Sequence, residues 1–140
     1  MSNDSDKVAF LVKKAALAFD KLANPALVQY DLTVSQYKIL KFLYLQPSRK
    51  ARMVDIEKYY YLTHPTTLGL LENLEKKGFV TRVPNPEDAR SKLISLTEKA
   101  DAMQDELVSL ADTFADELTV NLTEKEKQRL AQLLQKLLEK

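Results

Sequence analysis

Hydrogen-bonding side chains gather in the middle third of this sequence and are its main candidates for functional chemistry. Hydroxyl, imidazole and amide groups can bond to the edges of bases or to phosphates, and basic side chains can pair with phosphates. The candidates for base or phosphate contact are His64, Thr66, Thr67 and Asn73, with Arg82 and Lys92 as candidates for phosphate contact alone. These residue types are compatible with contacts to a nucleic acid.

The sequence offers little material for catalysis, metal binding or redox chemistry. It has no cysteine, and its one histidine, His64, cannot build a zinc site without several carboxylate helpers. It also contains no Gly-rich phosphate loop and no nucleophile motif. We therefore expect a protein that is not an enzyme and that needs no cofactor or metal.

Charge is distributed unevenly along the chain, although the net charge is only +1. From Arg49 to Lys92 there are nine Lys or Arg against six Asp or Glu, so the middle third is mildly basic. A dimer would present this excess twice, which is compatible with DNA binding. No apolar run approaches the roughly 18 to 20 residues that cross a bilayer, so we expect a soluble, cytoplasmic protein without membrane contact.

Start and stop signals locate the helices that carry these side chains. Two capping boxes are predicted, Thr33 with Gln36 and Thr123 with Glu126. Pro65 fits the first turn of a helix that starts near Thr63 or His64, because a proline there gives up only an N–H without an intrahelical partner. Gly78 is expected to end that helix.

A hairpin and a pair of helices define the predicted fold. Two β-prone runs, 79–83 and 92–96, flank the turn-rich segment 84–91 and predict a two-stranded hairpin. Residues 53–60, a break at 61–62 and residues 63–77 predict a helix-turn-helix, for which the hairpin would be the wing. The longer helix would then fit the major groove of DNA.

Amphipathic helices at both ends of the chain predict a dimer. Their apolar stripes would stay partly exposed on one chain, so we expect them to pack against a second copy, the alternative being that they all fold back on one chain. The fold class is mostly α with a small β-hairpin, a single unit over 1–140. It divides into a winged helix-turn-helix DNA-binding part, 31–96, and a helical dimerisation part, 1–30 and 97–140. The stripe of the last helix consists of Leu130, Leu133, Leu134, Leu137 and Leu138.

Three segments resemble blocks of the MarR family of winged helix-turn-helix transcriptional regulators, namely LTVSQY at 32–37, LENLEKKGFV at 71–80 and DARSKLISLT at 88–97. The last is the most specific, because the wing of that family reads Asp-x-Arg, a basic residue and then a strand ending in Leu-Thr. The resemblance implies a bacterial or archaeal homodimer that binds an inverted repeat in double-stranded DNA, usually as a repressor. It also implies that Arg90 reaches the minor groove, that Asp88 orients it, and that Ser91 belongs to the same DNA-binding wing.

Elementary electrostatics agrees with this role for Arg90. The narrow minor groove concentrates negative potential, and a guanidinium is planar, always charged and weakly hydrated. The alternative is that Asp88 and Arg90 only form a surface pair that closes the turn.

The predicted recognition helix departs from the family pattern. Leu68, Gly69 and Glu72 stand where relatives usually carry Arg, Lys or small polar residues. Glycine in a helix interior costs about 1 kcal/mol relative to alanine, which indicates close approach of the DNA backbone or, as the favoured interpretation, of a neighbouring helix. A winged-helix protein-interaction module without strong DNA binding is therefore the alternative function.

The aromatic residues support weaker expectations. Consecutive helical positions point about 100° apart, so at least one ring of Tyr59, Tyr60 and Tyr61 should leave the core. Tyr30 and Tyr37 lie at the junction where relatives often bind a small aromatic effector. Such an effector is a candidate partner that would change the spacing of two recognition helices, but no residue is assigned to it.

Overall fold

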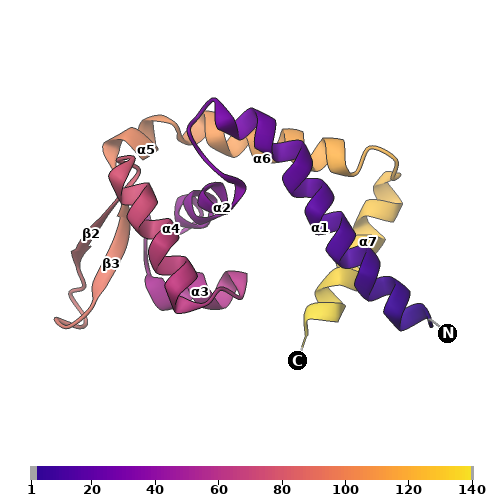
Figure 1. Cartoon of the computed structure of the whole chain (residues 1–140), viewed down its shortest axis with the longest axis horizontal. Helices are drawn as coiled ribbons and strands as arrows, with labels where there is room; N and C mark the ends of the chain where they lie inside the picture. The colour runs from indigo at the N-terminus through magenta and orange to yellow at the C-terminus, as the bar shows by residue number, and fades with distance from the viewer. Residues whose placement is uncertain (1–2, 140) are drawn as a thin grey trace. The chain divides into compact units, whose positions relative to one another are not determined.

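The computed structural model describes residues 3–139, most of which are helical (Figure 1). Its elements in chain order are α1 (Asp4–Val28), α2 (Val34–Tyr44), β1 (Lys50–Arg52), α3 (Met53–Tyr60), α4 (His64–Lys76), β2 (Val80–Pro84), β3 (Lys92–Leu96), α5 (Glu98–Ala102), α6 (Gln104–Leu118) and α7 (Glu124–Leu138). They form two compact units. The larger unit is Ala23–Leu110, and the smaller unit combines Met1–Leu22 with Ala111–Lys140.

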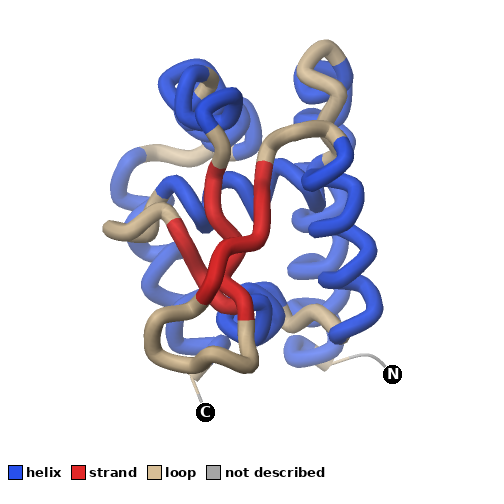
Figure 2. The backbone as a smooth tube through the Cα atoms, turned by 90° about the vertical axis from the view of Figure 1, so that its left-hand side faces the viewer, coloured by secondary structure: helices blue, strands red, loops and turns tan. Residues whose placement is uncertain are grey.

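The sheet of the larger unit has three antiparallel strands in the order β1-β3-β2, shown together in red in Figure 2. The predicted hairpin is confirmed, with Val80 opposite Leu96 and Pro84 opposite Lys92. The sheet has one strand more than the predicted hairpin, because Lys50–Arg52 pairs with β3 on its other side. Three residues carry too little local signal to predict a strand, and β1 exists because β3 supplies its hydrogen-bonding partners.

The helix-turn-helix consists of α3, a turn and α4, as the sequence predicts. Tyr61 takes the left-handed conformation (φ 55°) at the end of α3. The Thr63 hydroxyl then accepts a hydrogen bond from the Thr66 N–H and begins α4, with Pro65 in the first turn. Gly78 follows the end of α4 at φ +83°, a conformation that glycine adopts without strain. These local signals fix where the proposed recognition helix begins and ends.

Two tyrosine hydroxyls tie α2 to the segment after the wing. Tyr37 donates to the Leu107 carbonyl (2.6 Å), and Tyr44 donates to the Ala100 carbonyl (2.5 Å). Burial raises the pKa of Tyr44 to about 12 because the phenolate would be poorly solvated. The helical segment after Thr97 is broken at Met103 into α5 and α6. The fully buried core of this unit includes Leu27, Ile39, Leu40, Leu43, Ile56, Leu71, Leu74, Phe79, Ile94 and Leu107.

The smaller unit has a small aromatic contact and much exposed apolar surface. Phe19 of α1 and Phe114 of α6 meet edge to face, with ring centroids 6.0 Å apart. The predicted capping box of Thr123 and Glu126 begins α7, yet α7 has no buried residue. The leucines of its stripe are all exposed, as are Val8, Phe10, Leu11 and Val12 of α1. Within residues 3–139, no helix is both long and apolar enough to cross a membrane.

Candidate nucleic-acid interface

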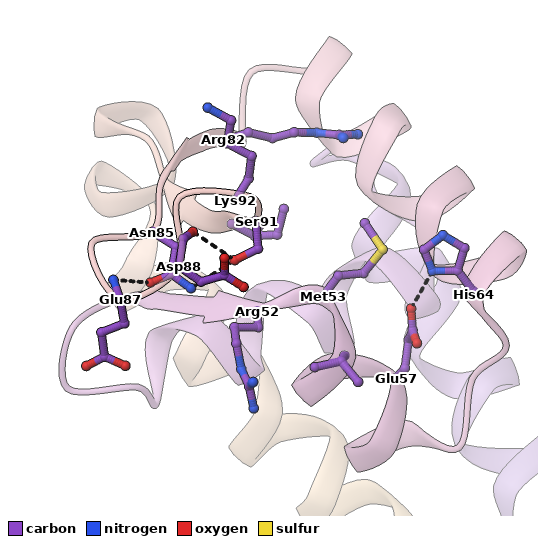
Figure 3. Close-up of a pocket in the computed structure, with 12 residues that line it drawn as sticks. Arg52, Met53, Glu57, His64, Arg82, Asn85, Glu87, Asp88, Ser91 and Lys92 are labelled. Carbon is purple, nitrogen blue, oxygen red and sulfur yellow. Dashed lines mark hydrogen bonds and ion pairs between the residues drawn. The ribbon is translucent and has the colours of Figure 1, made fainter.

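A groove of about 750 Å³ lies between the helix-turn-helix and the wing (Figure 3). Arg82 and Lys92 extend from β2 and β3 at one side of it, and His64 and Glu57 face each other at the other side. His64 Nδ1 lies 2.9 Å from Glu57 Oε1, which connects the first turn of α4 to α3. Five of the residues singled out from the sequence line this groove, namely His64, Arg82, Asp88, Ser91 and Lys92.

The threonines at the start of α4 have different environments. Thr66 is exposed, and its side chain hydrogen-bonds to the Thr63 hydroxyl at 3.0 Å. Thr67 is fully buried and its hydroxyl donates to the Thr63 carbonyl at 2.9 Å. A buried, satisfied hydroxyl cannot reach a ligand in the groove of DNA, so we remove Thr67 from the candidate contacts. Asn73 is exposed and remains among them.

The wing loop is ordered by its own polar side chains. Asn85 Oδ1 accepts from the Glu87 N–H and Asp88 Oδ1 accepts from the Arg90 N–H, both at 3.0 Å. The Asn85 amide also donates to the Ser91 hydroxyl at 3.1 Å. Ser91 therefore closes the turn, and we place it in support of the wing.

The side chain of Arg90, in contrast to its backbone N–H, takes no part in the hydrogen bonds that order this turn. Its side chain is 95% exposed, and its Nε lies 3.7 Å from Asp88 Oδ1. The distance and exposure make this a weak ion pair, so the guanidinium can exchange Asp88 for another anion at little cost. This is the geometry of an exposed surface pair, and the orienting role of Asp88 stays a prediction.

The groove carries charges of both signs. Arg82 pairs with Glu75 of α4 at 3.6 Å, while Lys92 is exposed. Glu57, Glu87 and Asp88 offset the cations around the groove, so excess positive charge is not what distinguishes it. Within residues 3–139, no cluster of three or more His, Cys, Asp or Glu side chains is placed to hold a metal ion.

Sequence reasoning missed four polar residues that line the groove, namely Arg52, Glu57, Asn85 and Glu87. Arg52 makes two hydrogen bonds to the Asp55 carboxylate (3.0 and 2.9 Å). Those bonds lower the pKa of Asp55 and raise that of Arg52. The spacing of three residues at the start of a helix was the signal available for this pair. Asn85 could have been found from the Pro-Asn-Pro sequence of the turn.

Gly69 lies in the middle of α4 with open space beside it. A Cβ atom built on Gly69 would have no heavy atom within 4 Å other than those of its own helix and chain neighbours. The interpretation that a neighbouring helix packs closely there was therefore wrong for this chain. Packing within the folded chain therefore does not explain why this position is a glycine.

The aromatic expectations are resolved residue by residue. Tyr60 donates to the Lys38 carbonyl (2.7 Å), and burial raises its pKa to about 12. Tyr59 and Tyr61 are 62% and 70% exposed, which confirms that rings leave the core. Tyr37 is a buried core residue. The hydrogen bond that the Tyr30 hydroxyl donates to the Glu106 carboxylate raises the pKa of Tyr30. These contacts give no pocket residue for an effector.

Comparison with known proteins connects this architecture to bacterial regulators. Residues 32–92 match the model of the MarR family. The Multiple antibiotic resistance protein MarR of Escherichia coli is 32% identical over 120 residues, which cover 85% of this chain and 82% of that protein.

Two solved structures of DNA complexes share the fold. A mutant of E. coli MarR complexed with operator DNA has a TM-score of 0.84 at 29% identity, covering 99% of this chain and 100% of that one. The Staphylococcus aureus MepR–DNA complex has a TM-score of 0.82 at 29% identity, covering 93% and 95%.

Proposed function

Because the chain belongs to the MarR family of transcriptional regulators, we propose that it binds an inverted repeat in double-stranded DNA as a homodimer and represses transcription there. The family membership makes it a winged helix regulator and not an enzyme. The observation that carries the proposal is the pairing of a well-defined α4 with a wing whose arginine, Arg90, is 95% exposed. Both α4 and the wing belong to the larger unit, Ala23–Leu110.

The two elements serve different parts of DNA. A helix of the width of α4 enters the major groove, where His64, Thr66 and Asn73 can meet base edges or phosphates. We expect Arg90 of the wing to reach the minor groove, where potential is most negative. Arg82 and Lys92 contribute phosphate contacts that set position and strengthen binding without reading sequence.

The exposed apolar surface of the smaller unit supports the homodimer. All five stripe leucines of α7 are exposed in the single chain, together with apolar residues of α1. Contiguous apolar surface of this kind is costly in water, and a symmetric contact with a second copy would cover it. Two recognition helices related by a twofold axis would then bind half-sites about one helical turn apart.

A small-molecule effector completes the proposal. Rigid half-site spacing sets affinity, so a ligand that binds one spacing better than the other would release the DNA. The candidate effectors are small aromatic molecules. An effector among them would be recognised because its addition weakens DNA binding. No residue of the chain is assigned to this ligand.

Titration of fluorescently labelled DNA from the region upstream of its own gene tests the proposal. We expect sequence-selective binding whose logarithmic affinity falls linearly with the logarithm of salt concentration, by about 0.9 for each phosphate contact. Light scattering should give twice the mass of one chain. A monomeric mass would contradict the dimer, and binding that ignores salt would favour the protein-interaction alternative.

A further inference from the structure

Lys77, the residue that caps the end of α4, uses its side chain to bind a turn distant in the sequence. Its ammonium donates to the Asp31 carbonyl at 2.6 Å and to the Gln36 side-chain oxygen at 2.9 Å. Asp31 lies between α1 and α2, and Gln36 lies in the first turn of α2. The Lys77 side chain is 25% exposed, whereas the neighbouring Lys76 is an exposed residue. The two lysines at this helix end therefore have different surroundings.

Both acceptors are held in place by other hydrogen bonds. The Gln36 side-chain oxygen also accepts from the Thr33 N–H at 3.1 Å, within the capping box that begins α2. Asp31 has φ 60°, and the N–H groups of Asp31 and Leu32 bond to carbonyls in the last turn of α1. Aspartate tolerates this left-handed conformation better than most residues do. The ammonium thus meets a turn whose geometry is already fixed.

The charge of Asp31 contributes little to this contact. Its carboxylate lies 3.7 Å from the Lys77 ammonium and its side chain is 83% exposed, so water screens the pair. The two shorter bonds, both to neutral oxygens, determine where the ammonium lies. Their loss should not unfold the chain, because Gln36 keeps its bond from Thr33 and Asp31 is an exposed residue.

The turn that Lys77 binds ends a helix shared by both units. α1 begins in the smaller unit, which includes residues up to Leu22, and ends at Val28 in the larger unit. The exposed apolar residues of α1 belong to the surface proposed to form the dimer. Within residues 3–139, no other side chain of α4 or its caps hydrogen-bonds to the turn between α1 and α2. Lys77 is therefore the side-chain hydrogen-bond link from α4 to the end of α1.

The opposite end of α4 carries the groups proposed to contact bases. His64 and Thr66 lie in its first turn, about 16 to 20 Å from Lys77 at 1.5 Å per residue. Over that length, a tilt of about 3° at the Lys77 end moves the first turn by about 1 Å. Hydrogen bonds to base edges tolerate displacements of only about 0.5 Å. A small change at the Lys77 end is therefore enough to break a base contact.

The other polar contacts at this end of α4 involve its backbone. Lys99 of α5 donates to the Lys77 carbonyl at 2.7 Å, and the Thr97 hydroxyl donates to the Gly78 carbonyl at 2.6 Å. A substitution of the Lys77 side chain leaves both acceptors in place. Such a variant removes the link to the end of α1 and keeps the link to α5.

We propose that Lys77 is a positioning residue for DNA recognition. Its ammonium ties the end of α4 to the end of α1 and so sets the angle at which the first turn of α4 meets the bases. This inference rests on the proposed function, because it assigns Lys77 a role in that same DNA binding. Lys77 acts through the placement of α4 and not by contact with DNA.

Lys77→Met tests this role, because methionine keeps most of the aliphatic side chain and removes the ammonium. Lys76→Met is the matched control, since it removes the same charge from an exposed position one residue away. Each full-length protein is titrated at fixed salt against the best duplex that the parent selects from a random pool and against a scrambled duplex of equal length. Thermal melting followed by circular dichroism fixes an assay temperature at which all three proteins are folded.

The ratio of affinities for the two duplexes is the informative result. Lys77→Met should bind the selected duplex about tenfold more weakly, which corresponds to one lost base contact, and should bind the scrambled duplex as Lys76→Met does. Non-specific binding follows the charge that faces phosphates, and the two variants lose equal charge. Lys76→Met should keep the ratio of the parent. A side chain that only supported folding would lower the melting temperature and leave the ratio unchanged.

The outcomes separate this inference from the function on which it rests. A ratio for Lys77→Met equal to that of the parent, whether both affinities fall or neither does, would overturn the inference while selective DNA binding still stood. A parent protein that selects no duplex would overturn the proposed function and the inference together.

Discussion

Replacing Arg90 by alanine tests the proposed minor-groove contact with the least disturbance of the protein. The side chain is 95% exposed, and its contact with Asp88 is a 3.7 Å ion pair in water. Such pairs contribute about 0 to 1 kcal/mol, so the free energy of unfolding should change by less than about 0.5 kcal/mol. The backbone N–H of residue 90 keeps its bond to Asp88 in the variant.

DNA binding should respond far more than folding. Loss of a groove-inserted arginine is expected to cost about 1 to 3 kcal/mol of binding free energy for each wing, or about fivefold to 150-fold in affinity. Breaking the weak ion pair between Arg90 and Asp88 costs little free energy, so it reduces this value only slightly when the guanidinium contacts DNA instead. A homodimer would lose the contact at both half-sites.

Anisotropy titration at fixed salt against one selected duplex measures the effect. Arg129→Ala is the matched control, since it removes an exposed arginine from α7 outside the winged unit. If Asp88 only orients Arg90, Asp88→Ala should weaken binding less, and the double variant should match Arg90→Ala. Equal affinity of Arg90→Ala and the parent would show that the wing arginine makes no contact and that the pair only closes the turn.

Three other predictions follow from the fold. Leu133→Glu with Leu137→Glu places charge in the exposed stripe of α7, so light scattering should show monomers, and an unchanged mass would remove α7 from the interface. Tyr44→Phe should cost about 1 kcal/mol of stability at pH 7 through loss of the bond to Ala100. The folded pKa of Tyr44, about 12, exceeds the ordinary 10.0, so the parent loses this contribution as pH rises from 10 toward 12. The free energy of unfolding of the variant should therefore fall less steeply with pH over this range than that of the parent. With no cysteine, hydrogen peroxide should leave DNA binding unchanged on the timescale of thiol oxidation, and rapid loss reversed by a thiol reductant would contradict this.

Features set by neighbouring residues were predictable from the sequence. The capping box at Thr33 and Gln36 forms as expected, because the threonine hydroxyl and glutamine side chain need only three residues of helix to meet. Gly78 ends α4 for a similarly local reason, its access to positive φ. The hairpin follows from two β-prone runs around a turn-rich segment.

Features set by distant partners were not predictable. β1 depends on pairing with β3, some forty residues away, and Arg49 before it has φ 60°, which no local signal required. The burial of Thr67 depends on how α4 packs, because a threonine in the first turn of a helix suits either face. The break at Met103 likewise follows α5, whose Ala100 carbonyl accepts a hydrogen bond from Tyr44 of α2.

The ordered wing loop has a thermodynamic consequence for recognition. The side chains of Asn85 and Asp88 hold backbone N–H groups of the turn before any ligand arrives. The backbone of the wing therefore loses little conformational entropy on binding, and the ordering loss falls mainly on the side chain of Arg90. A wing of this kind should associate without a folding step, so calorimetry of binding should show a heat-capacity change set by the buried contact surface and not by the ordering of a loop.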